Sequence, residues 1–189
     1  QPHLVRRIAR AGHELASHGM SHAMLHRLCP DTFAGELRDS KRLLEDLGGR
    51  EVLGFRAPTF SLTHRTAWAL DVLAGEGYRY DASVFPVRHD RYGVADAPRG
   101  CHVARGPGGG ELLEIPPLTL RMGRSNLPVG WGGYFRLLPG WLLRHAVALS
   151  ARAGRTAMLY LHPWELDPDQ PELPLRRLSR FRHRVNLAR

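Results

Sequence analysis

The sequence predicts an α/β fold in which short buried strands pair in parallel and helices cover them, either as a barrel or as an open sheet. Two observations lead to this expectation. Segments with helical spacing of apolar residues alternate along the chain with short apolar runs. Reactive side chains also fall directly after the apolar runs, where the carboxyl ends of parallel strands collect functional groups.

The first elements follow from capping residues and periodicity. A helix is expected from Pro2 to Gly12, because proline suits a first turn and glycine a helix end. Residues 13–18 have the character of a strand. Asp31 is a suitable N-cap for a second helix of about sixteen residues. The two glycines at 48–49 end that helix.

The middle of the chain repeats the same alternation. Residues 52–55 form a short apolar run that we expect to be a buried strand. Thr63 can cap the next helix, which should stop near residues 75–77. Strand character returns at 78–80, and residues 112–115 predict another strand.

The second half is less regular. Residues 88–110 are rich in glycine, proline and polar side chains and predict a long excursion. The glycine-rich residues 130–133 lead into a helix that should begin near Pro139 and end around Gly154. Residues 156–161 form a continuous apolar run, which is the pattern of a strand buried on both faces.

Length and composition indicate one globular domain. The chain has 189 residues, with 43% hydrophobic and 24% charged residues, so we expect a single domain over 1–189 with a basic C-terminal segment at 170–189. The longest apolar stretch, 137–151, is interrupted and too short to span a bilayer. Cys29 and Cys101 belong to no C-x-x-C pair and are interpreted as free thiols.

The net charge of +9 comes almost wholly from arginine. An anionic partner would explain it, whether nucleic acid, an acidic glycan or a membrane surface. We favour an arginine-rich solvated surface of the kind that a GC-rich genome encodes, because no basic helix or aromatic-interleaved basic run precedes the C-terminus. Nucleic acid is therefore not an expected partner.

Four reactive side chains occupy corresponding places in the predicted fold. His18, Arg56, Asp81 and His162 each end or follow a predicted strand. Because the carboxyl ends of parallel strands meet at one rim, we expect these side chains to form one catalytic site.

Two histidines in this set have metal-ligand spacing. His18 and His22 are four residues apart, so both imidazoles can turn toward one zinc-like ion from a helical turn or a tight loop. Ordinary surface histidines are the competing interpretation. His26 continues the spacing and is the chief alternative ligand.

Three motifs resemble a known family. Residues 18–22 (HGMSH), 56–60 (RAPTF) and 161–163 (LHP) are similar to the second, third and fifth motifs of the polysaccharide deacetylase family, the NodB-homology domain. Residues 133–139 (GYFRLLP) and 161–168 (LHPWELDP), with 180–183 (RFRH), resemble more narrowly the subfamily found beside exosortase and exopolysaccharide gene clusters.

The resemblance implies a distorted (β/α) barrel and a set of catalytic roles. His18 and His22 would be ligands of a divalent metal, zinc by expectation. Arg56 would orient the carboxylate that acts as general base. His162 would be the general acid that protonates the leaving amine, and Asp81 would orient His162.

The resemblance also implies a substrate site. Pro58, Phe60 and Trp164 would wall the sugar, and backbone N–H groups around Phe60 would help to hold the oxyanion. The expected partner is a polysaccharide with N-acetylated sugars.

One family motif is absent from the sequence. The first motif supplies the base aspartate and the third metal ligand, yet Glu14 is the only acidic residue before His18. The chain also begins at Gln1, without an initiator methionine. We therefore expect a fragment that lacks the first strand or strands of the barrel and is inactive alone. No export signal is visible, so cytoplasmic localisation is the expectation.

These inferences predict a metal-dependent hydrolase that removes N-acetyl groups from a bacterial polysaccharide during exopolysaccharide biosynthesis or modification. Two alternatives remain open. An allantoinase-like amidohydrolase would act on a small cyclic amide in an enclosed cavity, whereas an inactive remnant would only bind carbohydrate. The expected loops 88–110 and 118–133 could shape either an open groove or a closed pocket.

Overall fold

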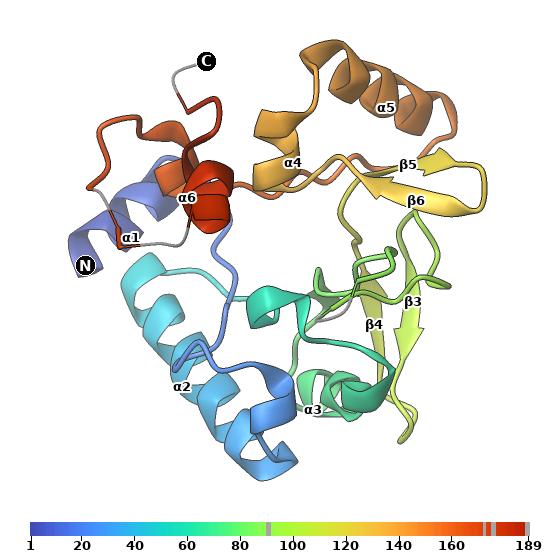
Figure 1. Ribbon diagram of the computed structural model, residues 1–189. Coiled ribbons are helices and arrows are strands. Elements are labelled where there is room, and N and C mark those ends of the chain that lie inside the picture. Colours follow the sequence, from blue (N-terminus) through green and yellow to red (C-terminus); the bar gives the residue numbers. More distant parts are fainter. Residues whose placement is uncertain (90–91, 172, 175–176, 188–189) are drawn as a thin grey trace. The chain divides into compact units, whose positions relative to one another are not determined.

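The computed structural model describes residues 1–89, 92–171, 173–174 and 177–187 (Figure 1). The chain folds into two compact units, 1–116 and 117–189. Each unit is described by itself below. The expected basic segment at 170–189 is described only in part, since 172, 175–176 and 188–189 lie outside the described residues.

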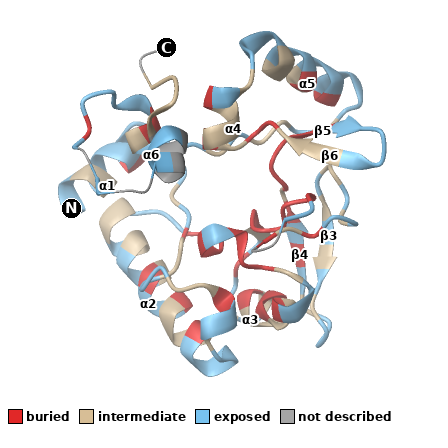
Figure 2. Cartoon of the chain, in the orientation of Figure 1, coloured by how far each residue is buried: buried red, intermediate tan, exposed pale blue. Residues whose placement is uncertain are grey.

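Three α-helices form the helical layer of the first unit. They are α1 (Pro2–Arg10), α2 (Pro30–Gly48) and α3 (Trp68–Gly75). Helix α2 packs against α1 and α3, and α3 also packs against a strand of the sheet (Figure 1). In α2 the buried residues lie on one side of the helix (Figure 2), as the 3.6-residue period requires.

The expected cap of α2 is wrong by two positions. Cys29 is the N-cap and Pro30 the first helical residue, so Asp31 lies in the first turn. The fixed φ of proline preorganises the first helical position, which explains the earlier start. The helix is 19 residues long and ends, as expected, at Gly49, whose φ is +66°.

Short 3₁₀ turns separate the longer elements. They are η1 (Leu25–Arg27), η2 (Pro58–Phe60) and η3 (His64–Thr66). Thr63 caps η3, where its N–H donates to Thr66 Oγ1 at 2.9 Å. The prediction that Thr63 caps the helix itself is wrong, because Ala67 is the N-cap of α3 and Thr63 caps the short turn before it.

The sheet of the first unit is mainly parallel, as expected. Strands β1 (Gly54–Phe55), β2 (Tyr80–Asp81) and β4 (Glu111–Glu114) are parallel neighbours, and β3 (His102–Arg105) runs antiparallel to β4. The order is β1-β2-β4-β3. The register aligns Phe55, Asp81 and Glu114 at the carboxyl ends of the three parallel strands.

The predicted strand at 13–18 is wrong. Only Ser17 pairs, through an isolated parallel bridge to Phe55. Its N–H donates to Gly54 O at 2.9 Å, and Arg56 N–H donates to Ser17 O at 3.0 Å. Because β1 is two residues long, it offers too few backbone groups for a longer ladder.

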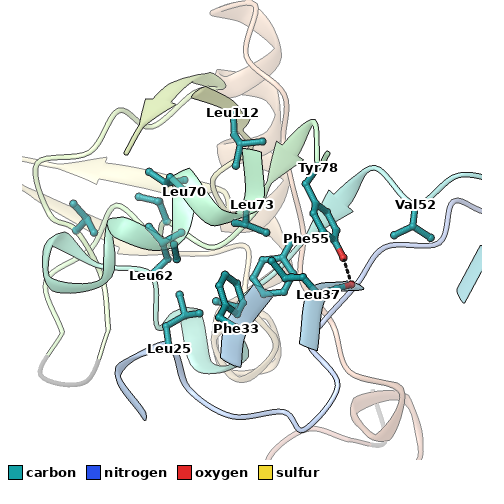
Figure 3. Packing of buried hydrophobic residues seen from close by; sticks show 14 residues of the cluster. Leu25, Phe33, Leu37, Val52, Phe55, Leu62, Leu70, Leu73, Tyr78 and Leu112 are labelled. Atoms are coloured by element: carbon teal, nitrogen blue, oxygen red, sulfur yellow. Dashed lines mark hydrogen bonds between the residues drawn. The ribbon is translucent and has the colours of Figure 1, made fainter. Parts of the chain in front are cut away.

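The core of the first unit lies between the helices and the sheet (Figure 3). Phe33 of α2 meets Phe55 of β1 edge-on, with ring centroids 5.4 Å apart. The Tyr78 hydroxyl donates to Leu37 O at 3.2 Å, which satisfies a buried polar group. Each large apolar side chain buried here contributes about 1.5–3 kcal/mol.

The second unit contains a hairpin and several helices. Its elements are β5 (Thr119–Met122), β6 (Ser125–Pro128), α4 (Gly132–Leu137), α5 (Gly140–Arg152), η4 (Pro163–Leu166) and α6 (Arg177–Arg184). Strands β5 and β6 pair antiparallel. The expected helix from Pro139 is confirmed, with Pro139 as N-cap of α5.

The predicted strand at 156–161 is also wrong. Met158 and Tyr160 form isolated bridges to Pro117 and Trp131. The side chains between and after them are exposed, Leu159 by 40% and Leu161 by 39%. The run is thus an extended segment with alternating exposure and not a strand buried on both faces. No helix in the described ranges is both long and apolar enough to cross a membrane.

Candidate metal and catalytic site

A loop after the Ser17 bridge carries the two predicted metal ligands. The chain turns at Gly19, whose φ is +80°, and reaches His22, whose φ is +58°. Glu36 of α2 secures the turn by accepting from the Ser21 hydroxyl. The rings of His18 and His22 approach edge-on, with centroids 4.9 Å apart and planes at 74°. The structure therefore brings the two histidines together on a loop.

The neighbouring backbone fixes the tautomer of His18. Its Nδ1 lies 2.6 Å from the carbonyl oxygen of Arg56. A carbonyl only accepts hydrogen bonds, so Nδ1 carries the proton and Nε2 presents the lone pair in the neutral ring. Metal-binding histidines are commonly oriented by such a bond from their other ring nitrogen.

The histidine pair fits a metal ion only in part. Two imidazoles on one tetrahedral zinc, with bonds of about 2.0 Å, would have centroids about 5 Å apart. The observed separation of 4.9 Å agrees with this. However, the described residues contain no group of three His, Cys, Asp or Glu side chains that could hold a metal ion. They thus supply two neutral ligands without a carboxylate.

The segment after β1 is held in a fixed shape. Arg56 Nε donates to Ala82 O at 3.1 Å, and Ala57 N–H donates to Ser83 Oγ at 2.7 Å. Thr59 and Phe60 both adopt left-handed backbone conformations, with φ of +56° and +49°. Non-glycine residues rarely adopt this region, which marks the segment as constrained by its surroundings.

The two predicted sugar-wall residues of this segment are buried. Pro58 is fully buried, and Phe60 is 2% exposed, with its ring 5.1 Å from that of Phe85. Thr59 between them is exposed. Contact of Pro58 and Phe60 with a sugar stays a prediction.

Asp81 belongs to a buried pair of carboxyl groups. Asp81 and Glu114 are register partners on β2 and β4, and both are fully buried. Asp81 accepts from Ser83 Oγ at 2.5 Å and from Ser83 N–H at 3.1 Å. Glu114 accepts from Val84 N–H at 2.9 Å. These bonds tie the strand ends to the segment that follows Asp81.

Burial raises the pKa of both carboxyl groups in this pair. The pKa of Glu114 is raised well above the usual value, first by burial and then by the nearby charge of Asp81. The Glu114 carboxyl group first, and then Ser83 and backbone N–H groups, stabilise the Asp81 carboxylate and so oppose the rise in its pKa. We conclude that Glu114 is the protonated member of the pair.

In the second unit, His162 lies among polar partners. Its Nε2 is 2.9 Å from the Tyr160 hydroxyl, and its Nδ1 is 3.7 Å from Glu165 Oε2. The buried Glu165 also accepts from the backbone N–H of His162 at 3.0 Å. This arrangement favours a proton on Nδ1, beside the carboxylate, and a lone pair on Nε2 directed at the Tyr160 O–H.

Trp164 and Arg136 complete this cluster. The Trp164 ring stacks on His162 with centroids 5.2 Å apart, and the Arg136 guanidinium lies 5.5 Å from the Trp164 centroid. Arg136 also reaches Glu165 at 3.6 Å in a buried ion pair. A Cβ on Gly132 would lie 1.8 Å from Glu165 Oε1, so glycine is required there.

The predicted site residues fall in different units. His18, His22, Arg56 and Asp81 lie in the first unit, whereas His162 lies in the second. The proposed orientation of His162 by Asp81 stays a prediction. Within the second unit, Glu165 is the carboxylate beside His162.

The sequence interpretation missed Glu114 and Glu165. Glu114 ends its strand as Asp81 ends β2, and this position at the carboxyl end was the available signal. Glu165 is three residues after His162, the spacing of a capping box, which the turn η4 confirms.

Two protein-family models match different parts of the chain. Residues 82–189 match the family described as "Domain of unknown function (DUF3473)", which covers more than half of the chain, and residues 1–80 match "Polysaccharide deacetylase". The chain therefore belongs to the DUF3473 family, and its first 80 residues are similar to the polysaccharide deacetylase family. The motifs at 133–139 and 161–168 both fall within that region, and the narrower exosortase-associated subfamily stays a prediction. Among curated proteins, none matches the chain.

Solved structures of similar fold match most of the chain. A Mycobacterium smegmatis protein named as a polysaccharide deacetylase matches with a TM-score of 0.60 and 24% identity, over 86% of this chain and 54% of its own. Puue allantoinase matches with a TM-score of 0.58 and 18% identity, over 100% and 54%. A Pseudomonas aeruginosa PAO1 protein named as a polysaccharide deacetylase has a TM-score of 0.54 and 18% identity, over 85% and 50%.

These likenesses confirm the predicted fold class, the distorted (β/α) barrel type of the polysaccharide deacetylases. The chain spans about half the length of the solved structures that it matches.

Proposed function

We propose that this chain is part of a metal-dependent hydrolase that removes N-acetyl groups from a bacterial polysaccharide, in the making or modification of an exopolysaccharide. The observation that carries the proposal is the bond from His18 Nδ1 to Arg56 O at 2.6 Å. It joins two of the family motifs and prepares His18 to bind a metal through Nε2.

His18 and His22 would hold the metal as two of its ligands. When bound, a divalent ion such as zinc supplies Lewis acidity, which polarises an acetamide carbonyl and acidifies a water molecule. The backbone of Arg56 orients the His18 ring and fixes the proton of its neutral form on Nδ1. The side chain of Arg56 would orient the carboxylate of the general base, which the family similarity places in its first motif.

His162 would donate a proton to the leaving amine. Its neighbours hold the ring in place, because the Tyr160 hydroxyl lies 2.9 Å from Nε2 and the Glu165 carboxylate lies 3.7 Å from Nδ1. Trp164, stacked on His162 and half-buried, would offer a flat apolar face to a sugar ring. Asp81 would orient His162, as the family resemblance implies.

Two other functions compete with deacetylation. The likeness to Puue allantoinase shows a shared fold and leaves hydrolysis of a small cyclic amide as an alternative. A carbohydrate-binding protein without catalysis is the other alternative, since the described residues provide no third metal ligand. The family match of residues 1–80 favours the deacetylase.

The test is acetate release by the full-length protein from chitotetraose, with added zinc and, in parallel, with a chelator. Allantoin is the second substrate. Zinc-dependent acetate release supports the proposal. Turnover of allantoin alone would favour the amidohydrolase, and oligosaccharide binding without either reaction would favour the binding protein.

A further inference from the structure

A cleft of about 830 Å³ opens in the first unit, and part of its lining comes from residues that follow His22 and Arg56 closely in the chain. Its walls come from η1 and the residue before it, from the segment 59–66, and from residues around Tyr92. The volume is in the range of sites that enclose a small ligand. In the sequence, η1 begins three residues after His22, and Thr59 lies three residues after Arg56.

The cleft walls are fixed by hydrogen bonds. Leu25 N–H donates to Ser61 Oγ at 3.1 Å, which ties η1 to the end of η2. Thr66 Oγ1 donates to Ser61 O at 2.7 Å, which ties η3 to the same point. The two short turns therefore present Arg27 and Arg65 to one cleft.

The charge of the cleft is positive. Arg27 and Arg65 line it, and the described lining residues include no Asp or Glu. In the described ranges of the chain, neither guanidinium forms an ion pair with a carboxylate. Two arginines that face one concave site without an acidic partner favour an oxyanion, because a guanidinium binds a carboxylate through two parallel hydrogen bonds.

The remaining lining suits a sugar. Thr59 offers an exposed hydroxyl, and His26 and His89 offer imidazole nitrogens. His89 stacks on Tyr92 with centroids 3.8 Å apart and planes at 10°. Tyr92 is only 6% exposed and packs against the His89 ring. It therefore offers no exposed ring face on which a nucleobase could stack.

We propose that this cleft binds the carboxylate of an acidic sugar in the polysaccharide, beside the N-acetylated sugar that reacts. The inference rests on the proposed deacetylase function and names its substrate class, an anionic N-acetylated glycan. Arg27 and Arg65 would bind the carboxylate, and Thr59 would bind a sugar hydroxyl. The net charge of +9 agrees with an anionic substrate.

The experiment measures binding to the full-length protein by titration calorimetry. The probe is a hyaluronan tetrasaccharide, which alternates N-acetylated and carboxylated sugars, and the matched neutral probe is its carboxyl-reduced form. The variants are Arg27→Gln, Arg65→Gln and the double variant. Arg42→Gln, an exposed arginine of α2 outside the cleft, is the control. Circular dichroism melts confirm that each variant is folded.

The wild type should bind the carboxylated probe at least about tenfold more tightly than the neutral one, since a charge-assisted bond is typically worth that factor or more. Each single variant should lose about tenfold, and the double variant should bind the two probes equally. Arg42→Gln should change the affinity by less than about twofold.

Equal binding of both probes by the wild type would overturn the inference. So would complete displacement of the tetrasaccharide by equimolar inorganic sulfate, or tighter binding of an oligonucleotide of equal charge. Acetate release from chitotetraose is measured separately. If the protein releases acetate but binds both probes equally, the deacetylase proposal is retained and this inference is rejected. If the protein prefers the carboxylated probe but releases no acetate, this inference is retained and the deacetylase proposal is rejected.

Discussion

The hydrogen bond from His18 to the backbone of Arg56 links two segments that lie far apart in the sequence. It determines which ring nitrogen is available to a metal. The His22 side chain is more exposed than that of His18. The backbone of His22 is left-handed, and its ring lies edge-on to the His18 ring. The separation of the two rings therefore agrees with a shared ion, although the sequence spacing of the pair alone is common in proteins.

His18→Ala or His22→Ala should abolish stoichiometric zinc or cobalt binding in the full-length protein, because each removes one ligand of a small donor set. His26→Ala should leave the metal content unchanged. Metal analysis after dialysis checks this. Unchanged metal in the His18 variant would exclude His18 as a ligand.

His162→Ala should retain the metal and lose about 10²–10⁴ in kcat, the usual contribution of a general acid. Acetyl substrates with better leaving groups should lose less. His145→Ala, an exposed histidine of α5, is the matched control. If His162→Ala loses metal and activity together, His162 is a ligand and its assigned role is wrong.

The Asp81 and Glu114 pair makes stability depend on pH. The pKa of Glu114 is higher in the folded state than in the unfolded state. When the pH rises above the ordinary pKa of glutamate, the folded protein therefore keeps a proton on Glu114 that the unfolded protein has lost. Wild-type stability should therefore fall relative to Glu114→Gln as pH rises from the ordinary glutamate pKa, about 4, toward the raised pKa of the folded state.

Thermal melts of both proteins across that pH range check this expectation. Glu111→Gln changes an exposed glutamate of the same strand and should follow the wild type. Parallel curves for wild type and Glu114→Gln would show that Glu114 ionises normally.

At this scale the sequence predicted Asp81 correctly as a residue at a strand end, whereas His18 follows only the isolated bridge of Ser17. It could not reveal that Asp81 pairs with Glu114, because the register of β2 against β4 is set by tertiary packing. Glu165 was hidden for a similar reason, since its partner Arg136 is 29 positions away and spacing carries no sign of the contact.

Helix α2 shows how an element positions the loop that carries the histidines. Its buried face includes Phe33 and Leu37, which pack on β1 and Tyr78 (Figure 3). Glu36, between them, reaches the Ser21 hydroxyl. The helix therefore connects core packing to the shape of the loop that carries the two histidines.

Leu37→Ala should lower the free energy of unfolding by about 2–5 kcal/mol, because it leaves a cavity in the core. Leu43→Ala in the same helix removes a side chain that is 46% exposed and should cost less than about 1 kcal/mol. Urea unfolding followed by circular dichroism compares them. Similar losses would mean that Leu37 is not a core residue.

Helices were predicted better than strands. The 3.6-residue period predicted the bounds of α2 and α5 to within a few residues, since a helix satisfies the hydrogen bonds of its own backbone. The predicted strands at 13–18 and 156–161 became isolated bridges, because a strand needs a neighbour long enough to pair with. The hairpin of β5 and β6 was missed, although its two-residue turn contains Gly123 with φ of +55°.

At the scale of the whole molecule, two family matches divide the chain near residue 81. The boundary between the two compact units lies at a different position, after residue 116. The polysaccharide deacetylase match thus ends within the first unit, and β4 with Glu114 belongs to the DUF3473 region. Family boundaries and structural boundaries need not coincide.

We predict that the 189-residue chain releases little acetate alone, since its described residues lack a third metal ligand. A version extended by the upstream coding sequence should gain metal affinity, thermal stability and turnover together, if that sequence supplies an aspartate motif. Both are assayed with zinc and chitooligosaccharides, and the extended version must show turnover before they are compared. Equal turnover would mean that Glu14 or Asp81 supplies the carboxylate.

The left-handed backbone at Thr59 bears on any attempt to improve this protein by laboratory evolution. A β-branched residue in that region costs about 1–2 kcal/mol, and glycine at 59 would recover part of it despite the loss of about 0.5–1 kcal/mol in chain entropy. Screens that reward heat resistance alone would therefore enrich glycine there. The same replacement would loosen the segment between Arg56 and the cleft, so such screens would trade catalysis for robustness unless both are selected.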